Sequence, residues 1–432
     1  MKKIIVLILI TSVVACYLMG SEIPKPMYPT YKGLIMCGYQ GWFRAEGDAS
    51  NSGWGHYGRG GKFDPEHNTI DIWPDVSEYE KTYETDFSYP DGSKAKVFSS
   101  VDKSTTDLHF KWMKEYGIDG VFMQRFYGVT RGKKHRKFQD KILMNAFKAS
   151  QKYDRAIAVM YDLSGLQPDK DDCQNVINDW KHLVDDMKVK NFGKKQTYLH
   201  HNNKPLVTIW GVGFPDRSYD IKKIGLDKLI DFLKNDPEYG GCSVMLGVPT
   251  YFRELNKDCS PEPYLHELIE SADIVLPWMV QRFTPLVHKP MDHIRDHVKA
   301  DIKWTKEHGV DYVPIVYPGF SWRNLSLKHK DLARYTAYGA IPRLGGRFYW
   351  DQMATMIQAG AEMIYVAMFD EVDEGTAIFK VSDTPPNSDK AHFIDNDGAP
   401  SDQYLWLTGL GGKMLRKEIP VKLDMPTRDV QK

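Results

Sequence analysis

The fold is decided by the stretch FYWDQMATMIQAGAEMIYVAMF, residues 348–369 of this 432-residue chain. Its first part, Phe348 to Ala359, is expected to form a helix that stops at Gly360, because glycine readily adopts the left-handed conformation that ends a helix. Its last part, Met363 to Phe369, is apolar throughout, which is typical of a parallel strand with both faces covered. Helix, glycine and buried strand in this order indicate a parallel α/β fold.

The same order recurs along the chain. Asp107 to Tyr116 has apolar residues at helical spacing and stops at Gly117, and Met291 to His308 stops at Gly309 in the same way. Gln403 to Lys417 can supply a last helix, although its glycines weaken it. Short apolar runs predict eight strands: Leu34–Tyr39, Gly120–Gln124, Ala156–Tyr161, Pro205–Trp210, Ser243–Gly247, Ile274–Trp278, Tyr312–Tyr317 and Met363–Phe369.

Eight strands that alternate with about eight helices predict a (β/α)8 TIM barrel with enlarged βα loops, a single catalytic domain over residues 30–432. The largest insertion, 43–101, follows the first strand and is expected on the active-site face. A doubly wound open sheet is the alternative. Gly38 to Trp42, after the first strand, lacks the spacing of the glycine-rich phosphate turn that such a sheet normally carries.

Composition excludes some classes of function. Hydrophobic residues make up 42% of the chain, enough for a sizeable core, and the 57 Lys and Arg equal the 57 Asp and Glu. A net charge of zero implies no strongly basic face, so nucleic acid is not an expected partner. We expect a monomer.

The N-terminus has the pattern of an export signal over residues 1–20. Met1-Lys2-Lys3 precedes an apolar run, and Ala15-Cys16 follows it. The sequence Val-Val-Ala-Cys16 resembles a bacterial lipobox, which predicts a lipid on Cys16 as the only membrane attachment. An ordinary signal cleaved near Gly20, or an uncleaved anchor, is the alternative, because the apolar run continues past the cysteine. The expected location is the periplasm or outer membrane of a bacterium.

The other four cysteines, Cys37, Cys173, Cys242 and Cys259, show no metal-ligand spacing. Some of them can pair in an exported protein. We expect neither a metal nor a cofactor.

Side chains at the carboxyl ends of the strands are the candidates for a binding site, since catalytic groups of such barrels project there. Aromatic rings can cover the apolar face of a sugar, while Arg and Asp satisfy its hydroxyls. The alternative for several aromatics is that they close the top of the core. The candidates are Tyr39, Trp42, Arg125, Tyr127, Tyr161, Asp162, Trp210, Tyr251, Arg253, Trp278, Arg282, Tyr317 and Asp370.

The acidic segment Asp370-Glu371-Val372-Asp373-Glu374, directly after the last strand, is the sharpest signal. Glycosidic cleavage needs two carboxyl groups, one of which protonates the leaving oxygen. Neighbouring carboxylates raise each other's pKa, which helps to keep one of them protonated near neutral pH. Two alternatives are a calcium site formed by Asp370, Asp373 and Glu374, and a solvated turn.

Glu371-x-x-Glu374-Gly375-Thr376 resembles the Glu-Trp-x-Glu-Gly-Thr motif of the glycoside hydrolase family 99 endo-α-mannosidases and the wider family 71/99-like group. Trp54-Gly55-His56 resembles a Trp/His element of that family, which adds Trp54 and His56 to the candidate substrate-binding residues. The segments 109–120, 203–206 and 317–320 also resemble family elements, in the same order along the chain.

The resemblance implies retaining hydrolysis of an α-linked glycan. Glu371 would act as a base on the sugar 2-hydroxyl and Glu374 as the general acid/base. Val372 stands where the family has Trp, Asp370 where Asn is usual, and the family's Tyr-Pro-Trp-Tyr element is replaced by Tyr39-Gln40-Gly41-Trp42. The resemblance therefore carries the catalytic pair and not a specificity for mannan. The alternatives are a conventional glycosyl-enzyme route and a non-catalytic carbohydrate-binding surface lipoprotein.

Overall fold

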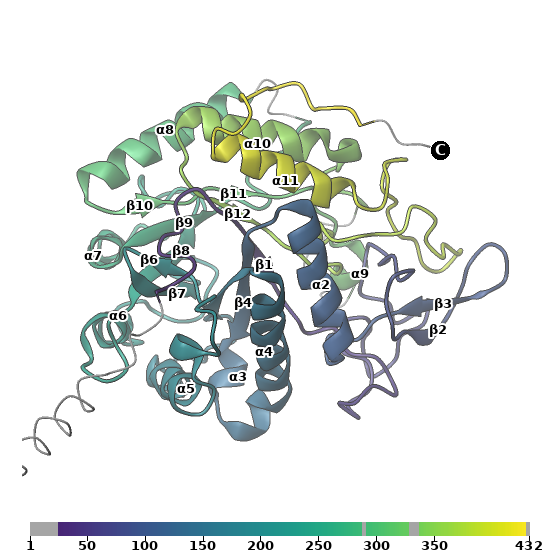
Figure 1. Cartoon of the computed structure of the whole chain (residues 1–432), viewed down its shortest axis with the longest axis horizontal. Helices are drawn as coiled ribbons and strands as arrows, with labels where there is room; N and C mark the ends of the chain where they lie inside the picture. Colours follow the sequence, from purple (N-terminus) through teal and green to yellow (C-terminus); the bar gives the residue numbers. More distant parts are fainter. Residues whose placement is uncertain (1–24, 287–290, 328–336, 429–432) are drawn as a thin grey trace, which may run out of the picture.

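The computed structural model describes residues 25–286, 291–327 and 337–428 (Figure 1). The predicted export signal, with Cys16, lies outside the described residues. Among the described helices, none is long and apolar enough to cross a membrane.

A parallel sheet forms the centre of the molecule. Its strands follow one another in the order of the chain: β1 (Ile35–Tyr39), β4 (Gly120–Phe126), β5 (Ala156–Asp162), β7 (Lys204–Trp210), β8 (Ser243–Pro249) and β9 (Ile274–Trp278). On the other side of β1 lies β12 (Ile364–Val366). Nearly all residues of these strands are buried, which explains their apolar sequences.

The segment that closes the sheet is the seventh predicted strand. It is divided at Val313-Pro314 into β10 (Asp311–Tyr312), which pairs with β9, and β11 (Ile315–Val316), which pairs with β12. The amide of Val313 donates to Val275 and the amide of Tyr365 donates to Pro314. One short segment thus bridges both ends of the sheet, which confirms the (β/α)8 barrel.

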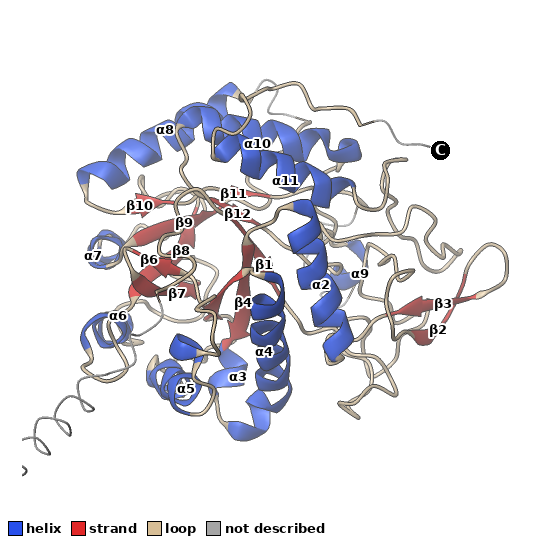
Figure 2. Ribbon diagram, in the orientation of Figure 1, coloured by secondary structure: helices blue, strands red, loops and turns tan. Residues whose placement is uncertain are grey.

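Helices surround the barrel (Figure 2). They are α2 (Lys103–Tyr116), α3 (Tyr127–Thr130), α4 (Lys133–Tyr153), α5 (Gln174–Asp185), α6 (Leu226–Asn235), α7 (Tyr264–Ser271), α8 (Asp292–Glu307), α9 (Arg323–Ser326), α10 (Arg347–Ala359) and α11 (Gln403–Leu415). Gly117 and Gly360 end α2 and α10 with φ of 76° and 104°, as the sequence predicts. A two-residue strand, β6 (His200–His201), pairs antiparallel with β7.

The insertion 43–101 forms an irregular layer with one antiparallel hairpin, β2 (Tyr83–Ser88) and β3 (Lys94–Val97). It contacts α2, through Tyr79 and His109, and the chain that follows β12. The amide of Asp71 donates to the carbonyl of Val372, and Ile72 forms a bridge with Ile394. Because Val372 lies between the two candidate catalytic glutamates, the insertion is on the face of the barrel that carries them.

Candidate active site

The first carboxylate of the acidic segment after β12, that of Asp370, binds backbone amides. Asp370 is fully buried, and its two oxygens accept hydrogen bonds from the amides of Gln40 (2.7 Å) and Gly41 (2.9 Å) at the end of β1. Burial raises the pKa of Asp370 to about 7, although both amide donors oppose this shift. Asp370 therefore ties the loop after β12 to the loop after β1. Its oxygens are engaged by amides, which argues against the calcium site.

Hydrogen bonds from Ser321 and Arg343 hold the backbone of the same loop. The amide of Ser321 donates to the carbonyl of Glu374. The guanidinium of Arg343 is buried against the Tyr404 ring and donates to the carbonyls of Gly375 (3.1 Å) and Ala377 (3.0 Å). Because the anchors act on the main chain, the side chains of Glu371 and Glu374 are left for chemistry.

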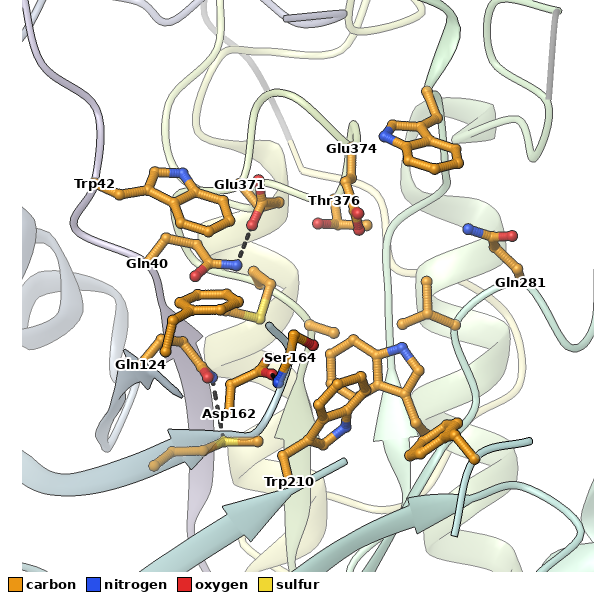
Figure 3. A pocket seen from close by; sticks show the side chains of 18 of the residues that line it. Gln40, Trp42, Gln124, Asp162, Ser164, Trp210, Gln281, Glu371, Glu374 and Thr376 are labelled. Atoms are coloured by element: carbon orange, nitrogen blue, oxygen red, sulfur yellow. Dashed lines mark hydrogen bonds between the residues drawn. The ribbon is translucent and has the colours of Figure 1, made fainter. Parts of the chain in front are cut away.

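Both glutamates reach one cavity of about 490 Å³ at the mouth of the barrel (Figure 3). This volume is within the range of small-molecule sites, roughly 300–1,000 Å³. The cavity has a mixed aromatic and polar lining, which is formed by Gln40, Trp42, Gln124, Phe126, Met160, Asp162, Ser164, Trp210, Phe214, Asp216, Arg217, Trp278, Val280, Gln281, Arg282, Trp322, Ala367, Met368, Glu371, Glu374 and Thr376.

Glu371 lies on the side of the cavity formed by β1. It is 1% exposed, and its Oε2 accepts a hydrogen bond from the side-chain amide of Gln40 (Figure 3). Its Oε1 has no hydrogen-bond partner within the described chain. Burial, followed by the charge of Asp373, raises the pKa of Glu371 well above its ordinary value.

Glu374 is partly buried and points into the same cavity, next to Thr376 (Figure 3). Burial raises its pKa to about 8, with further contributions from the negative charges of Asp373 and Asp162. No lysine or arginine forms an ion pair with Glu371 or Glu374 within the described ranges. The two carboxyls can therefore hold one proton between them near neutral pH, which is what an acid and base pair requires.

Two groups of aromatic rings face each other across the cavity. On the β1 side, the Trp42 indole stacks on His56 (ring centroids 3.8 Å apart, planes 5° apart) and on Phe126 (5.0 Å). On the far side, Trp210 meets Trp278 edge-on at 5.2 Å. Flat rings on both walls suit the apolar faces of sugar rings.

The strand register explains which of the predicted residues reach the cavity. Phe126, Asp162 and Trp210 are paired neighbours at the ends of β4, β5 and β7, and all three line the cavity. The structure brings seven of the predicted site residues to the cavity: Trp42, Asp162, Trp210, Trp278, Arg282, Glu371 and Glu374.

One residue earlier in the same strands, the side chains point outward, and two predictions are corrected here. Arg125 and Tyr161 are paired neighbours that both contact Asp179 of α5. Arg125 donates to Asp179 through Nε at 2.5 Å and is also bonded to Asp140 at 2.8 Å. Side chains alternate along a strand, so Arg125 and Tyr161 point away from the cavity and lie between the sheet and the helices.

The other predicted residues outside the cavity have partners of their own. Tyr39 bonds to His109 of α2, Tyr127 to the Asp172 carbonyl and Tyr317 to the Phe283 carbonyl. Arg253 pairs with buried Asp301, Tyr251 packs on His297, and Trp54 packs on Tyr57 and Phe63. The cavity that holds Glu371 and Glu374 is therefore lined by none of the predicted residues Tyr39, Trp54, Tyr127, Tyr251, Arg253, Tyr317 and Asp370. His56 lies behind Trp42 and acts on the cavity through that ring.

Several cavity residues were not predicted. Gln40 is not among the predicted residues, although it lies between two of them, Tyr39 and Trp42. Gln124, which ends a predicted strand, could have been included by the same strand-end rule. Arg217, Gln281 and Trp322 lie in loops beyond the strands, where no periodicity indicates direction. The four cysteines of the described chain are unpaired and buried, so none forms a disulfide.

Comparisons with known proteins agree with this architecture. No protein-family model matches the chain, and no curated protein matches it in sequence. Two solved structures of the glycoside hydrolase family 99 endo-α-mannosidase from Bacteroides thetaiotaomicron are similar to it. One, in complex with bis-tris propane, has a TM-score of 0.61 at 16% identity over 90% of this chain and 98% of its own. The other has a TM-score of 0.61 at 15% identity over 90% and 99%. The (β/α)8 fold predicted from the sequence pattern is thereby confirmed.

Proposed function

We propose that the chain is a glycoside hydrolase that cleaves an α-linked glycan with retention of configuration, with Glu371 and Glu374 as its catalytic carboxyls. The observation that carries this proposal is that both carboxyls line one cavity, with raised pKa values and aromatic walls on either side. The similarity in fold to an endo-α-mannosidase supports it.

Glu374, with a pKa of about 8, is suited to protonate the leaving oxygen at neutral pH. Glu371, which accepts a hydrogen bond from Gln40, takes the proton of the 2-hydroxyl as that oxygen attacks C1. The bond to the leaving group breaks, and a 1,2-anhydro sugar forms. Water, deprotonated by Glu374, then attacks C1, the C1–O2 bond opens, and Glu371 returns its proton to O2.

The first test is hydrolysis of a panel of α-mannans and related α-glycans by the wild type and by Glu371→Gln and Glu374→Gln. We expect both variants to lose at least about a hundredfold in kcat, the typical contribution of a general acid or base. Glu262→Gln, at a surface ion pair with Lys222, is the matched control. Hydrolysis that survives in both folded variants would refute the assignment, and binding without hydrolysis by the wild type would favour the carbohydrate-binding alternative.

A second test separates the two retaining routes. If the 2-hydroxyl is the nucleophile, a 2-deoxy analogue of the cleaved substrate should not react. A glycosyl-enzyme route, with a carboxylate as nucleophile, would still turn over this analogue and trap a covalent adduct on one glutamate.

The chain is further proposed to be exported and anchored through a lipid on Cys16, on the basis of its N-terminal sequence. Labelling of the protein with a radioactive fatty acid in a bacterial host tests this. The label should be lost in Cys16→Ala, and label in that variant would contradict the anchor.

A further inference from the structure

Two arginines, Arg217 and Arg282, line the cavity that holds the catalytic pair. They are the cationic members of its described lining, which includes neither lysine nor histidine. A guanidinium group can donate to sugar hydroxyls, but its charged, planar group binds carboxylates and sulfate-like oxyanions in preference. The arginines therefore bear on which glycan the cavity accepts.

Arg217 lies in the loop after β7, over the aromatic wall opposite Glu371. Its guanidinium is 5.1 Å from the ring centre of Trp210 and 5.6 Å from that of Phe214. Its ion-pair partner in the described chain is Asp216, at 3.8 Å from Nε, and that carboxylate is largely exposed. The Arg217 Nε is buried and has no hydrogen-bond acceptor among the described residues. Stacking thus holds the group in place while its hydrogen-bonding capacity is largely unused.

Arg282 lies in the loop after β9 and is held from behind. Its Nε donates to Asp258 at 2.5 Å, and Asp258 also accepts the amides of Thr250 and Tyr251. Asp258 is therefore shared among three donors. This arrangement fixes Arg282 at the cavity wall on the same side as Trp278, the last residue of β9.

The carboxyls of the cavity lining other than Asp216 balance little of the charge on Arg217 near neutral pH. Burial raises the pKa of Glu371, Glu374 and Asp162, and Glu371 and Glu374 share one proton near neutral pH, so the pair carries about one negative charge and not two. An arginine side chain stays charged throughout the physiological range. Arg282 is paired closely with Asp258, whereas the nearest carboxylate to Arg217, that of Asp216, is 3.8 Å away and largely exposed, so Arg217 is the cation of the lining with the most unused binding capacity.

The barrel also fixes where these charges meet a substrate, on the basis of the proposed function. In the closed strand order, β7 lies opposite β12, so Arg217 is across the cavity from Glu371 and Glu374. In a pyranose ring, C5 lies opposite C2. When Glu371 holds the 2-hydroxyl, the substituent on C5 is directed toward the side of Arg217.

We propose that the cavity is specific for an α-glycan whose sugar carries an anionic group at C6, either a carboxylate or a sulfate ester. Arg217 binds this anion over the Trp210 ring. Both sources of the anion share the oxyanion that a guanidinium recognises, and separate probes distinguish them.

The test uses three α-mannobiosides that differ at C6 of the sugar whose linkage is cleaved: the neutral parent, the 6-sulfate and the 6-carboxylate. We expect the wild type to prefer one acidic probe over the parent by roughly tenfold or more in kcat/KM, as for one charge-assisted hydrogen bond. Arg217→Met keeps the apolar stem over Trp210 and removes the charge. It should abolish most of this preference through KM, while Arg217→Lys retains part of it.

Arg347→Gln, on the outer helix α10, is the matched control and should leave the preference unchanged. Calorimetric binding to Glu374→Gln gives the same comparison without turnover. Equal use of all three probes by the wild type, or a preference that survives in Arg217→Met, would overturn the anionic site while the proposed hydrolase stands. Absence of hydrolysis of every α-glycan by the folded wild type would instead overturn the proposed function, and the anionic specificity with it.

Discussion

Two groups of carboxyls in the interior, Asp179 on α5 and the pair Glu371 and Glu374 after β12, differ in their partners. Asp179 is fully buried against Arg125, which donates to both of its oxygens. Glu371 and Glu374 are also in the interior, but their neighbours are Gln40 and further carboxyls. The guanidinium of Arg125 balances the charge of Asp179, whereas a buried carboxyl without a cation has a raised pKa and can exchange a proton. The first group supports the structure, and the second is suited to catalysis.

Removal of the arginine from the first group should have the largest effect. In Arg125→Met, Asp179 becomes a buried charge without a cation, and we expect a loss of about 3–5 kcal/mol in the free energy of unfolding. Urea denaturation measures it. Arg131→Met, which breaks the exposed pair with Asp171, should cost less than about 1 kcal/mol. Similar losses in the two variants would show that the buried pair has no special role.

In the second group, removal of a carboxyl should increase the stability of the folded chain at high pH. A carboxyl whose pKa is 4.5 when unfolded and about 8 when folded binds its proton more tightly in the folded state. Its contribution to stability therefore falls as the pH rises from about 4.5 to about 8. Glu374→Gln removes this penalty and should be more stable than the wild type by roughly 1–3 kcal/mol at pH 8, and equal to it below pH 4.

Thermal unfolding across this pH range measures the difference. Glu262→Gln, at the surface, should show no such pH dependence. A constant difference between Glu374→Gln and the wild type at all pH values would contradict the raised pKa of Glu374.

This contrast also shows what could be predicted from the sequence. The barrel follows from repeated units of helix, glycine and apolar strand, because each unit dictates its own local structure. The conformation of the insertion 43–101 cannot be predicted in this way, since its order comes from contacts with distant segments: α2, α9 and residues after β12.

For the candidate active site, the position of a residue at a strand end predicts that it lies near the mouth of the barrel. It does not predict whether its side chain points into the cavity or outward. Arg125 and Phe126 are adjacent, and a shift of one residue decides that the first meets Asp179 while the second faces the cavity. In fully apolar strands no alternation marks this register. The acidic loop was found because its charges follow a buried strand directly, whereas Arg217, seven residues beyond β7, has no such signal.

Asp373 is a neighbour of both Glu371 and Glu374, and its replacement should change the pKa of both. It is 2% exposed, and its charge raises the pKa of both Glu371 and Glu374. Asp373→Asn should lower both values and move the alkaline limb of the activity profile, expected near pH 8, down by about one pH unit. The pH dependence of kcat measures this shift, with Asp227→Asn, exposed on α6, as the control. An unchanged limb would mean that burial alone sets the pKa of Glu374.

The smallest effect concerns His56, which contacts both the cavity wall and the acidic group. Its ring stacks on Trp42, and its Nδ1 lies 3.4 Å from Asp373. His56→Ala should cost about 0.5–1.5 kcal/mol of stability and raise KM a few-fold, because the Trp42 indole loses its support. His56→Phe keeps a stacked ring without the contact to Asp373 and should restore KM. If KM stays high in His56→Phe, the contact with Asp373, rather than the stack, holds this wall, and the aromatic and acidic parts of the site then act as one unit.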